Sequence, residues 1–261
     1  MQPRSILITG ASSGIGAALA ACYAGPGMTL HLGGRDRRRL SQVVDRCRLL
    51  GAAAIGRAVD VTDAAAMARW INDADARAPL DLVIANAGIS TVTTGTGDDG
   101  PAAVRHVFAV NVDGVLNTVL PALDRIRGRA RRPGAWRGQI AIVSSLAGLR
   151  GMPGAPAYSA SKAAEKAWGE ALAVRLAPEG VAVSVVLPGF VDTPMTRGNY
   201  FRMPMLWPVD KAARMIRRGL RRRKRRIAFP LPMYLGAWFL NVLPRFVSDW
   251  LLARAPAKSK S

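Results

Sequence analysis

Tyr158 and Lys162 are the residues whose types and spacing most suggest chemistry. They stand four residues apart in a segment with helical composition, so they share one face of a helix. A free tyrosine has a pKa of about 10, which is too high for efficient proton transfer at neutral pH. A neighbouring ammonium group favours the phenolate and lowers this pKa. The pair therefore predicts that Tyr158 transfers protons, although the same spacing is common on ordinary helices.

Two consecutive serines, Ser144 and Ser145, follow an apolar run that we expect to be a buried strand. At the carboxyl end of such a strand, a hydroxyl group can hold a substrate oxygen while negative charge develops on it. Taken alone, the two serines could equally form a turn or a helix cap.

A glycine-rich turn over residues 9–16 joins the first expected strand to the first expected helix. Glycine suits such a turn because the backbone angles are unusual and a pyrophosphate must approach bare backbone. The helix N-terminus then offers unpaired N–H groups and partial positive charge to the phosphates. An ordinary tight turn is the alternative, but the flanking strand and helix favour a dinucleotide site. Its predicted contacts are Gly10, Ser12, Ser13, Gly14, Ile15 and Gly16.

The end of the second expected strand indicates which dinucleotide is bound. NAD sites place an Asp or Glu there to hold the ribose hydroxyl. In this sequence Gly34 occupies that position and Arg35 follows. An arginine pairs with the additional phosphate of NADP(H), whereas a carboxylate would repel it. We therefore expect NADP(H) rather than NAD(H), and we interpret the arginines at 37–39 as the solvated first turn of a helix.

Short apolar runs alternate with helical segments along the chain. This pattern predicts an α/β fold, a Rossmann-like doubly wound parallel sheet of about seven strands with helices on both faces. The segment 125–138 is basic and rich in Gly and Pro, and we expect a surface loop there. The expected strands are 5–9, 28–33, 55–60, 81–85, 139–143, 181–187 and 226–229, and the expected helices include 14–23, 37–49, 63–77 and 156–176.

These motifs, in this order, resemble the short-chain dehydrogenase/reductase family over roughly residues 4–230. The length and the three-residue gap between Gly10 and Gly14 resemble its short reductase-type members. The resemblance rests on the glycine turn, Asp60-Val61, Asn86-Ala87-Gly88, Asn111, Ser144-Ser145, Tyr158 with Lys162, and Pro188-Gly189.

The resemblance implies a catalytic set of Asn111, Ser145, Tyr158 and Lys162. The resemblance implies that Ser145 rather than Ser144 is the catalytic serine, because Ser145 lies the usual distance before the tyrosine. Lys162 would also hold the nicotinamide ribose. Asn111 would position a water beside Lys162. The remaining implied cofactor contacts are Asp60 and Val61 at the adenine, Asn86, Ala87 and Gly88, and Pro188, Gly189, Val191 and Thr193 along the nicotinamide. The family also implies a homodimer or homotetramer.

The stretch after Thr193 corresponds to the substrate lid of the family. Its apolar side chains suggest an adaptable lining for a hydrophobic substrate. They could equally cover the core, and the sequence leaves both interpretations open. These side chains are Met195, Phe201, Met203, Met205 and Trp207.

The net charge of +20 is concentrated towards the end of the chain. Residues 217–226 contain eight Lys/Arg, and residues 227–244 then contain no charge. A basic cluster beside an apolar, aromatic segment suggests peripheral attachment to an anionic membrane. Helices that close over the domain or form a dimer interface are the alternative. Nucleic-acid binding is not expected because no recognition motif accompanies the charge.

The cysteines Cys22 and Cys47 and the histidines His31 and His106 lack metal-ligand spacing, so no metal is expected. We expect a cytoplasmic protein because no signal peptide is evident. The predicted organisation is a catalytic domain over 1–230 and a helical extension over 231–261.

Together these features predict an NADP(H)-dependent carbonyl reductase or alcohol dehydrogenase that acts on a hydrophobic ketone, aldehyde or alcohol. The alternatives are an NAD-dependent alcohol dehydrogenase and a non-catalytic dinucleotide sensor or membrane-associated scaffold. The presence of all four residues of the catalytic set argues against the non-catalytic alternative.

Overall fold

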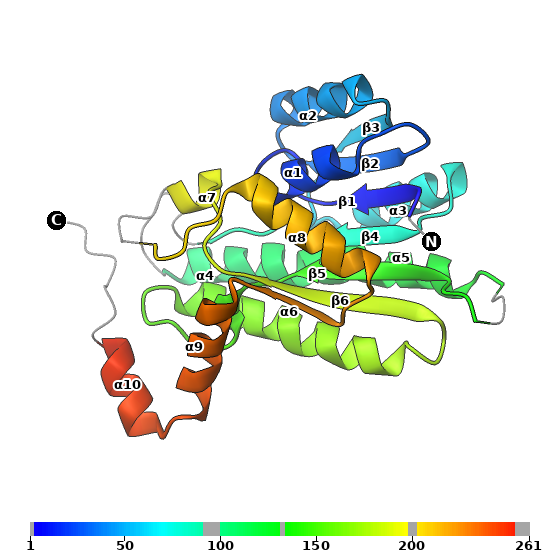
Figure 1. Ribbon diagram of the computed structural model, residues 1–261. Helices are drawn as coiled ribbons and strands as arrows, with labels where there is room; N and C mark the ends of the chain where they lie inside the picture. The colour runs from blue at the N-terminus through cyan, green and yellow to red at the C-terminus, as the bar shows by residue number, and fades with distance from the viewer. Residues whose placement is uncertain (1–2, 91–99, 131–133, 198–202, 254–261) are drawn as a thin grey trace.

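The computed structural model describes residues 3–90, 100–130, 134–197 and 203–253. Seven strands form one sheet in the order β3-β2-β1-β4-β5-β6-β7, and every neighbouring pair is parallel (Figure 1). The chain reverses its direction of winding between β1 and β4, which creates a crevice at the carboxyl edge of the sheet. The strands are β1 (Ser5–Ile8), β2 (Thr29–Gly34), β3 (Ala53–Ala58), β4 (Leu82–Ala85), β5 (Gly138–Val143), β6 (Val181–Pro188) and β7 (Arg226–Phe229).

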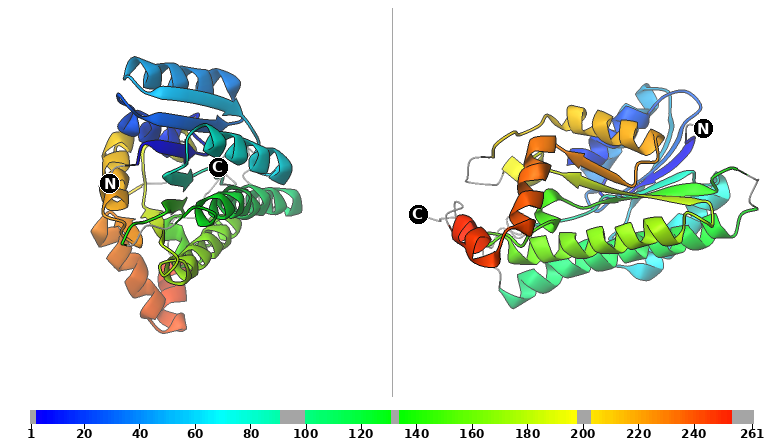
Figure 2. Two further views of the ribbon diagram at one scale, coloured as in Figure 1. Left: turned by 90° about the vertical axis from the view of Figure 1, so that its right-hand side faces the viewer. Right: turned by 60° about the horizontal axis from the view of Figure 1, so that its bottom comes forward.

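Helices cover both faces of this sheet, as the sequence predicts (Figure 2). One face carries α1 (Gly14–Tyr23), α2 (Arg37–Leu49) and α8 (Val209–Arg221), and the other carries α3 (Ala64–Arg77), α5 (Gly114–Arg127) and α6 (Pro156–Arg175). The remaining helical elements are α4 (Pro101–Phe108), the π-helical turn η2 (Ala109–Asp113), the 3-10 turn η3 (Leu146–Gly148), α7 (Pro194–Arg197), α9 (Leu231–Val242) and α10 (Arg245–Ala253).

The strands separate two hydrophobic cores. Side chains alternate between the faces of a strand, so Ile6 and Ile8 of β1 enter the core under α1, whereas Leu7 enters the core under α3 and α5. Burial on both faces explains why the strands read as continuous apolar runs.

The expected third strand was misplaced by two residues. The structure begins β3 at Ala53, which pairs with Thr29, and ends it at Ala58. This is an edge strand with mostly exposed side chains, so its hydrophobic pattern is weak. Val59 and Asp60 consequently lie beyond the strand, at the carboxyl edge of the sheet. The other six strands agree with expectation to within one residue at each end.

The expected surface loop over 125–138 was also partly wrong. Helix α5 continues to Arg127 because Ile126 is fully buried, and Gly138 already belongs to β5. Residues 131–133 of this segment lie outside the described part of the chain. Arg125 and Arg129 bind the carboxylate of Asp75, so two of the basic residues have structural partners.

Helices α9 and α10 extend the fold beyond β7 (Figure 1). The first half of α9 packs against β7 and η3 near the carboxyl edge, and Arg150 binds Asp249 of α10 at 2.7 Å.

Among the described residues, one helical run, 101–127, is long and apolar enough to cross a membrane. Half of its most apolar window is buried, and it packs against α3 and α6. Length and composition of this kind also occur in core helices, so the run carries no argument for a membrane span.

Candidate active site

The glycine turn between β1 and α1 has the geometry that a bound phosphate requires. Gly10 and Gly14 adopt φ angles of +63° and +53°, in the left-handed region that favours glycine. A Cβ atom added to Gly10 would lie 2.8 Å from the Cα atom of Ala87, so no larger residue fits at this position and the backbone stays uncovered. Gly16 has a different role from the predicted contact: its missing side chain lets α1 pack against the carbonyl oxygen of Gly10, and it does not line the cleft.

A cleft of about 1000 Å³ opens at the carboxyl edge of the sheet beside this turn. It brings together most of the residues that the sequence singled out from separate parts of the chain. These are Gly10, Ser12, Ser13, Gly14, Ile15, Arg35, Asp60, Val61, Asn86, Ala87, Gly88, Ser145, Tyr158, Lys162, Pro188, Gly189, Val191 and Thr193.

Two arginines, each beside an aspartate, mark one end of the cleft. Arg35 lies there with its side chain about half exposed, and its guanidinium is 3.8 Å from the Asp60 carboxylate. A side chain at Gly34 would lie 3.1 Å from Ser12, so an acidic residue at that position would crowd the glycine turn. Arg39 also lines the cleft, which corrects its interpretation as a purely solvated residue; it is paired with Asp36 at 2.8 Å.

The Asp60 carboxyl is held ionised at this end. Burial alone would raise the pKa of Asp60, but hydrogen bonds from Thr62 and the charge of Arg35 outweigh burial and lower it. Arg35 is thus already partly neutralised by a residue of the loop after β3.

Tyr158 and Lys162 lie on the same side of α6 and both line the cleft. The Nζ atom of Lys162 is 5.8 Å from the centre of the Tyr158 ring. Lys162 is 4% exposed, and its ammonium donates hydrogen bonds to the carbonyl oxygen of Val143 at 3.1 Å and to both carboxylate oxygens of Glu165 at 2.8 and 3.0 Å. Burial alone would lower the pKa of Lys162, but the Glu165 carboxylate outweighs burial and raises it.

Glu165 is the residue of this site that sequence reasoning missed. It follows Lys162 by three residues, so it shares the helix face that points at the sheet. That spacing was a usable signal, because an acidic residue on the buried face of a core helix requires a partner.

The two serines differ in how their hydroxyl groups are used. Ser144 is buried and donates to the carbonyl oxygen of Lys162 at 2.6 Å, which fixes α6 against β5. Ser145 is half-buried at the cleft, where its oxygen accepts from the Ala147 N–H at 3.1 Å and contacts the Pro188 carbonyl at 3.5 Å. The weaker bonding of Ser145 leaves its hydroxyl able to meet a ligand.

Asn111 is fully buried in the π-helical turn η2 and does not line the cleft. Its amide group bonds both backbone groups of Ile89, at 2.8 and 3.0 Å, and donates to the Ser161 hydroxyl at 2.9 Å. A side chain on Gly88 would lie 3.2 Å from Lys162 Nζ and 3.3 Å from Asn111 Oδ1, so the asparagine and the lysine converge beneath Gly88.

The apolar side chains of the lid segment divide between the two interpretations that the sequence left open, a substrate lining and a cover for the core. Met195 lines the cleft. Trp207 instead stacks on Phe229, with ring centres 5.1 Å apart, and so belongs to the core. Met205 is half exposed, and Phe201 lies outside the described residues.

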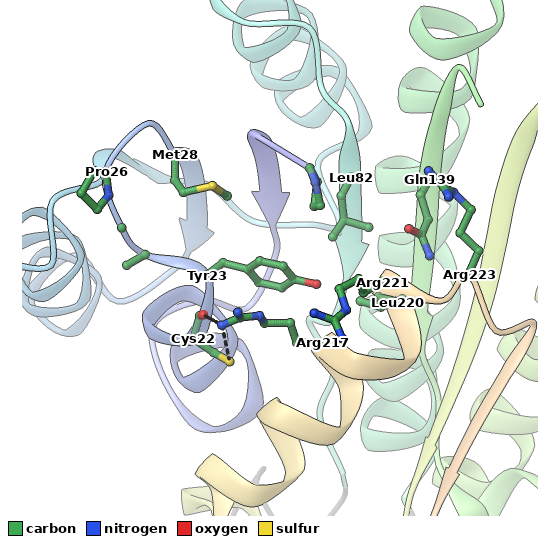
Figure 3. A pocket seen from close by; sticks show the side chains of 13 residues that line it. Cys22, Tyr23, Pro26, Met28, Leu82, Gln139, Arg217, Leu220, Arg221 and Arg223 are labelled. Carbon is green, nitrogen blue, oxygen red and sulfur yellow. Dashed lines mark hydrogen bonds between the residues drawn. The ribbon is translucent and has the colours of Figure 1, made fainter. Parts of the chain in front are cut away.

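A second, smaller hollow of about 240 Å³ lies at the opposite edge of the sheet, where the strands begin (Figure 3). Tyr23, Arg217, Arg221 and Arg223 line it, and Arg217 donates to the carbonyl oxygen of Cys22 at 2.5 Å. The basic run at the end of α8 therefore lies at one end of β7, and the apolar helix α9 follows the other end. Arg226, the last residue of the basic run and the first of β7, donates a hydrogen bond to the Tyr234 hydroxyl of α9 at 2.7 Å, so the two segments meet there.

A doubly wound parallel sheet with a glycine turn and a cleft at its carboxyl edge is the architecture of dinucleotide-binding proteins. The chain belongs to the short chain dehydrogenase family, whose model matches residues 4–201. An uncharacterized oxidoreductase of Myxococcus xanthus (strain DK1622) is 36% identical over 250 residues, which cover 95% of this chain and 96% of that protein.

Two solved structures extend this likeness. A short chain dehydrogenase from Mycobacterium paratuberculosis bound to NAD is 26% identical with a TM-score of 0.71, and the match covers 86% of this chain and 94% of that one. A short-chain dehydrogenase from Sphingobium yanoikuyae in complex with NADPH shares the fold at 24% identity and a TM-score of 0.74, over 98% of both chains. The chain is thus an oxidoreductase of CH–OH and C=O groups that uses NAD(P).

Proposed function

We propose that this protein is an NADP(H)-dependent carbonyl reductase or alcohol dehydrogenase that acts on a hydrophobic ketone, aldehyde or alcohol. The observation that carries the proposal is that Tyr158, Lys162 and Ser145 line the same cleft as the bare glycine turn. Proton transfer and dinucleotide binding can then occur side by side.

In this proposal the nicotinamide supplies or accepts a hydride when it is bound. Tyr158 donates a proton to the carbonyl oxygen during reduction and removes one during oxidation. Ser145 holds that oxygen by a hydrogen bond as charge develops on it. The Lys162 ammonium stabilises the phenolate and holds the ribose, and Asn111 supports the proton path from beneath Gly88.

The preference for NADP(H) rests on Arg35 and Gly34. Arg35 lines the cleft next to the glycine turn and can pair with a phosphate, while Gly34 places no carboxylate at the end of β2. The remaining predicted contacts, from Asp60 and Val61 to Thr193, would lie along the rest of the cofactor.

The cofactor proposal is tested by titrating the purified protein with NADPH and with NADH while following nicotinamide fluorescence and thermal stability. Preferential binding of NADPH supports the proposal, and binding of neither contradicts it.

We also propose that the C-terminal extension, residues 231–261, contacts an anionic membrane surface peripherally. The described side chains that support this are the exposed apolar residues of α9 and α10, which include Leu235, Trp238, Phe239 and Phe246. Because most of the basic run lies at the other end of β7, the contact would depend mainly on the apolar residues. A homodimer or homotetramer remains the expected assembly.

A further inference from the structure

Glu165 has a setting that packing does not explain. Its side chain is 2% exposed, on the face of α6 that meets the sheet. Its neighbours along that face include Gly169 and Leu172, which are also buried. A carboxylate in such surroundings is unfavourable unless it is paired, and its partner is Lys162, at 2.8 and 3.0 Å.

This inference rests on the proposed function of Tyr158 and Lys162. We propose that Glu165 is a positioning residue of the proton-transfer site: its carboxylate holds Lys162 Nζ beneath the cleft and keeps that amine charged beside Tyr158. Three contacts then hold the ammonium, two from Glu165 and one from the Val143 carbonyl.

The elements packed against α6 leave this pair electrostatically isolated. Strands β5 and β6 and the turn η3 contribute no titratable side chain. The neighbouring α4 and η2 contribute Arg105, His106 and Asp113, which are exposed and form no ion pair with Glu165. Tyr158 and Lys162 are therefore the ionisable groups that respond to the carboxylate.

The ionisation of Glu165 changes with pH near neutrality. Burial raises the pKa of Glu165 to about 7, although Lys162 opposes this shift. At alkaline pH, where a tyrosine ionises, the carboxylate is charged and its effect on Lys162 is complete.

The consequence can be measured without a substrate. Glu165→Gln keeps the shape of the side chain but removes its negative charge, so burial lowers the pKa of Lys162 and less ammonium charge acts on Tyr158 at alkaline pH. The Tyr158 phenolate then forms at higher pH, by about one pH unit, because a nearby positive charge is lost. Tyrosinate absorbance reports this ionisation once the same titration of a Tyr158→Phe variant is subtracted in each background.

Glu165→Asp should return the midpoint towards the wild-type value because it restores the charge. Glu170→Gln is the matched control: it removes a carboxylate from the same helix, where Glu170 pairs with Lys166 and Arg226 away from the cleft, and it should leave the midpoint unchanged. Glu165→Leu offers a second neutral replacement if the glutamine variant does not fold, with the same expected shift.

An unchanged midpoint, or a shift to lower pH, in the neutral variants would overturn the positioning role. The two proposals fail separately. If Tyr158→Phe retains turnover, the proposed function fails; if it abolishes turnover while the midpoint does not move in Glu165→Gln, the role of Glu165 alone fails.

Discussion

The two edges of the sheet each place a tyrosine beside a cation. At the carboxyl edge, Lys162 Nζ is 5.8 Å from the centre of the Tyr158 ring, and at the opposite edge the Arg217 guanidinium is 5.9 Å from that of Tyr23 (Figure 3). The two contacts are nearly equal in distance, yet their surroundings differ completely.

Tyr158 is half-buried at a cleft of about 1000 Å³ that also contains the glycine turn and Ser145. Tyr23 lines the small hollow, where burial raises its pKa further than Arg217 can lower it. Under the proposed function, a tyrosine beside a cation is therefore not sufficient for proton transfer. The site also requires an accessible cleft, a partner for the reacting oxygen and a place for the dinucleotide.

The largest expected effect comes from exchanging the two tyrosines for phenylalanine in turn. Tyr158→Phe removes the transferred proton and should lower turnover by about 10²–10⁴-fold, while NADPH affinity stays close to wild type. Tyr23→Phe should leave turnover unchanged. Steady-state kinetics with NADPH and a panel of apolar ketones and aldehydes measures both, and equal losses in the two variants would break the comparison.

The second comparison concerns arginines at the two edges. Arg35→Ala should weaken NADPH binding by roughly tenfold to a hundredfold, because a charge-assisted contact to the additional phosphate is lost, and should leave NADH binding unchanged. Arg217→Ala should affect neither cofactor. Fluorescence titration of both variants measures the NADPH and NADH affinities. If Arg35→Ala lost as much NADH affinity as NADPH affinity, the phosphate contact would be refuted.

At the edge where the strands begin, buried charge is expected to stabilise the fold rather than to serve catalysis. Asp75 is buried and accepts hydrogen bonds from the Leu80 N–H and from Arg125 and Arg129. Asp75→Asn should therefore lower the free energy of unfolding by about 2 kcal/mol in urea titrations and leave kcat unchanged. A loss of turnover in the folded variant would contradict this division between the edges.

The pH dependence of that loss follows from the sign of the pKa shift. Burial raises the pKa of Asp75, but the Leu80 hydrogen bond and the two arginines outweigh burial and lower it. A carboxyl group with a lowered folded-state pKa stabilises the protein above its unfolded pKa, and this contribution disappears as pH falls through the folded value. The deficit of Asp75→Asn should thus shrink below about pH 4.

The smallest effect is expected for the extension. Substituting Leu235 and Trp238 of α9 with serine should reduce co-sedimentation with vesicles that contain phosphatidylglycerol, because exposed apolar side chains are lost. Replacing Arg222 and Arg225 with serine should reduce it less, since most of the basic run lies at the other edge. The reverse order would indicate that the basic run makes the contact.

The sequence was sufficient for the sheet because buried parallel strands produce unbroken apolar runs. It misplaced β3, whose exposed edge position weakens that pattern, and it placed residues 125–127 in a loop because charged residues there hide the buried Ile126. Motif spacing predicted many of the residues that line the cleft, since most of them lie in the glycine turn, at the carboxyl ends of strands or on α6.

Other features depend on contacts between distant segments, which spacing does not encode. The burial of Asn111 against Ile89 joins residues 22 positions apart, and the separation of most of the basic run from α9 depends on the path of β7. Glu165 shows a different failure: its spacing from Lys162 was visible, but only the direction in which α6 faces reveals that the carboxylate is buried.

The most direct test of the central claim follows the hydride itself. The purified protein is incubated with NADPH deuterated at C4 of the nicotinamide and with the panel of apolar ketones and aldehydes, and the products are examined by mass spectrometry. The account predicts alcohols that carry deuterium on the former carbonyl carbon, formed by the wild type and by Tyr23→Phe but not by Tyr158→Phe. Tight NADPH binding without deuterium transfer in the wild type, or transfer that survives in Tyr158→Phe, would contradict it.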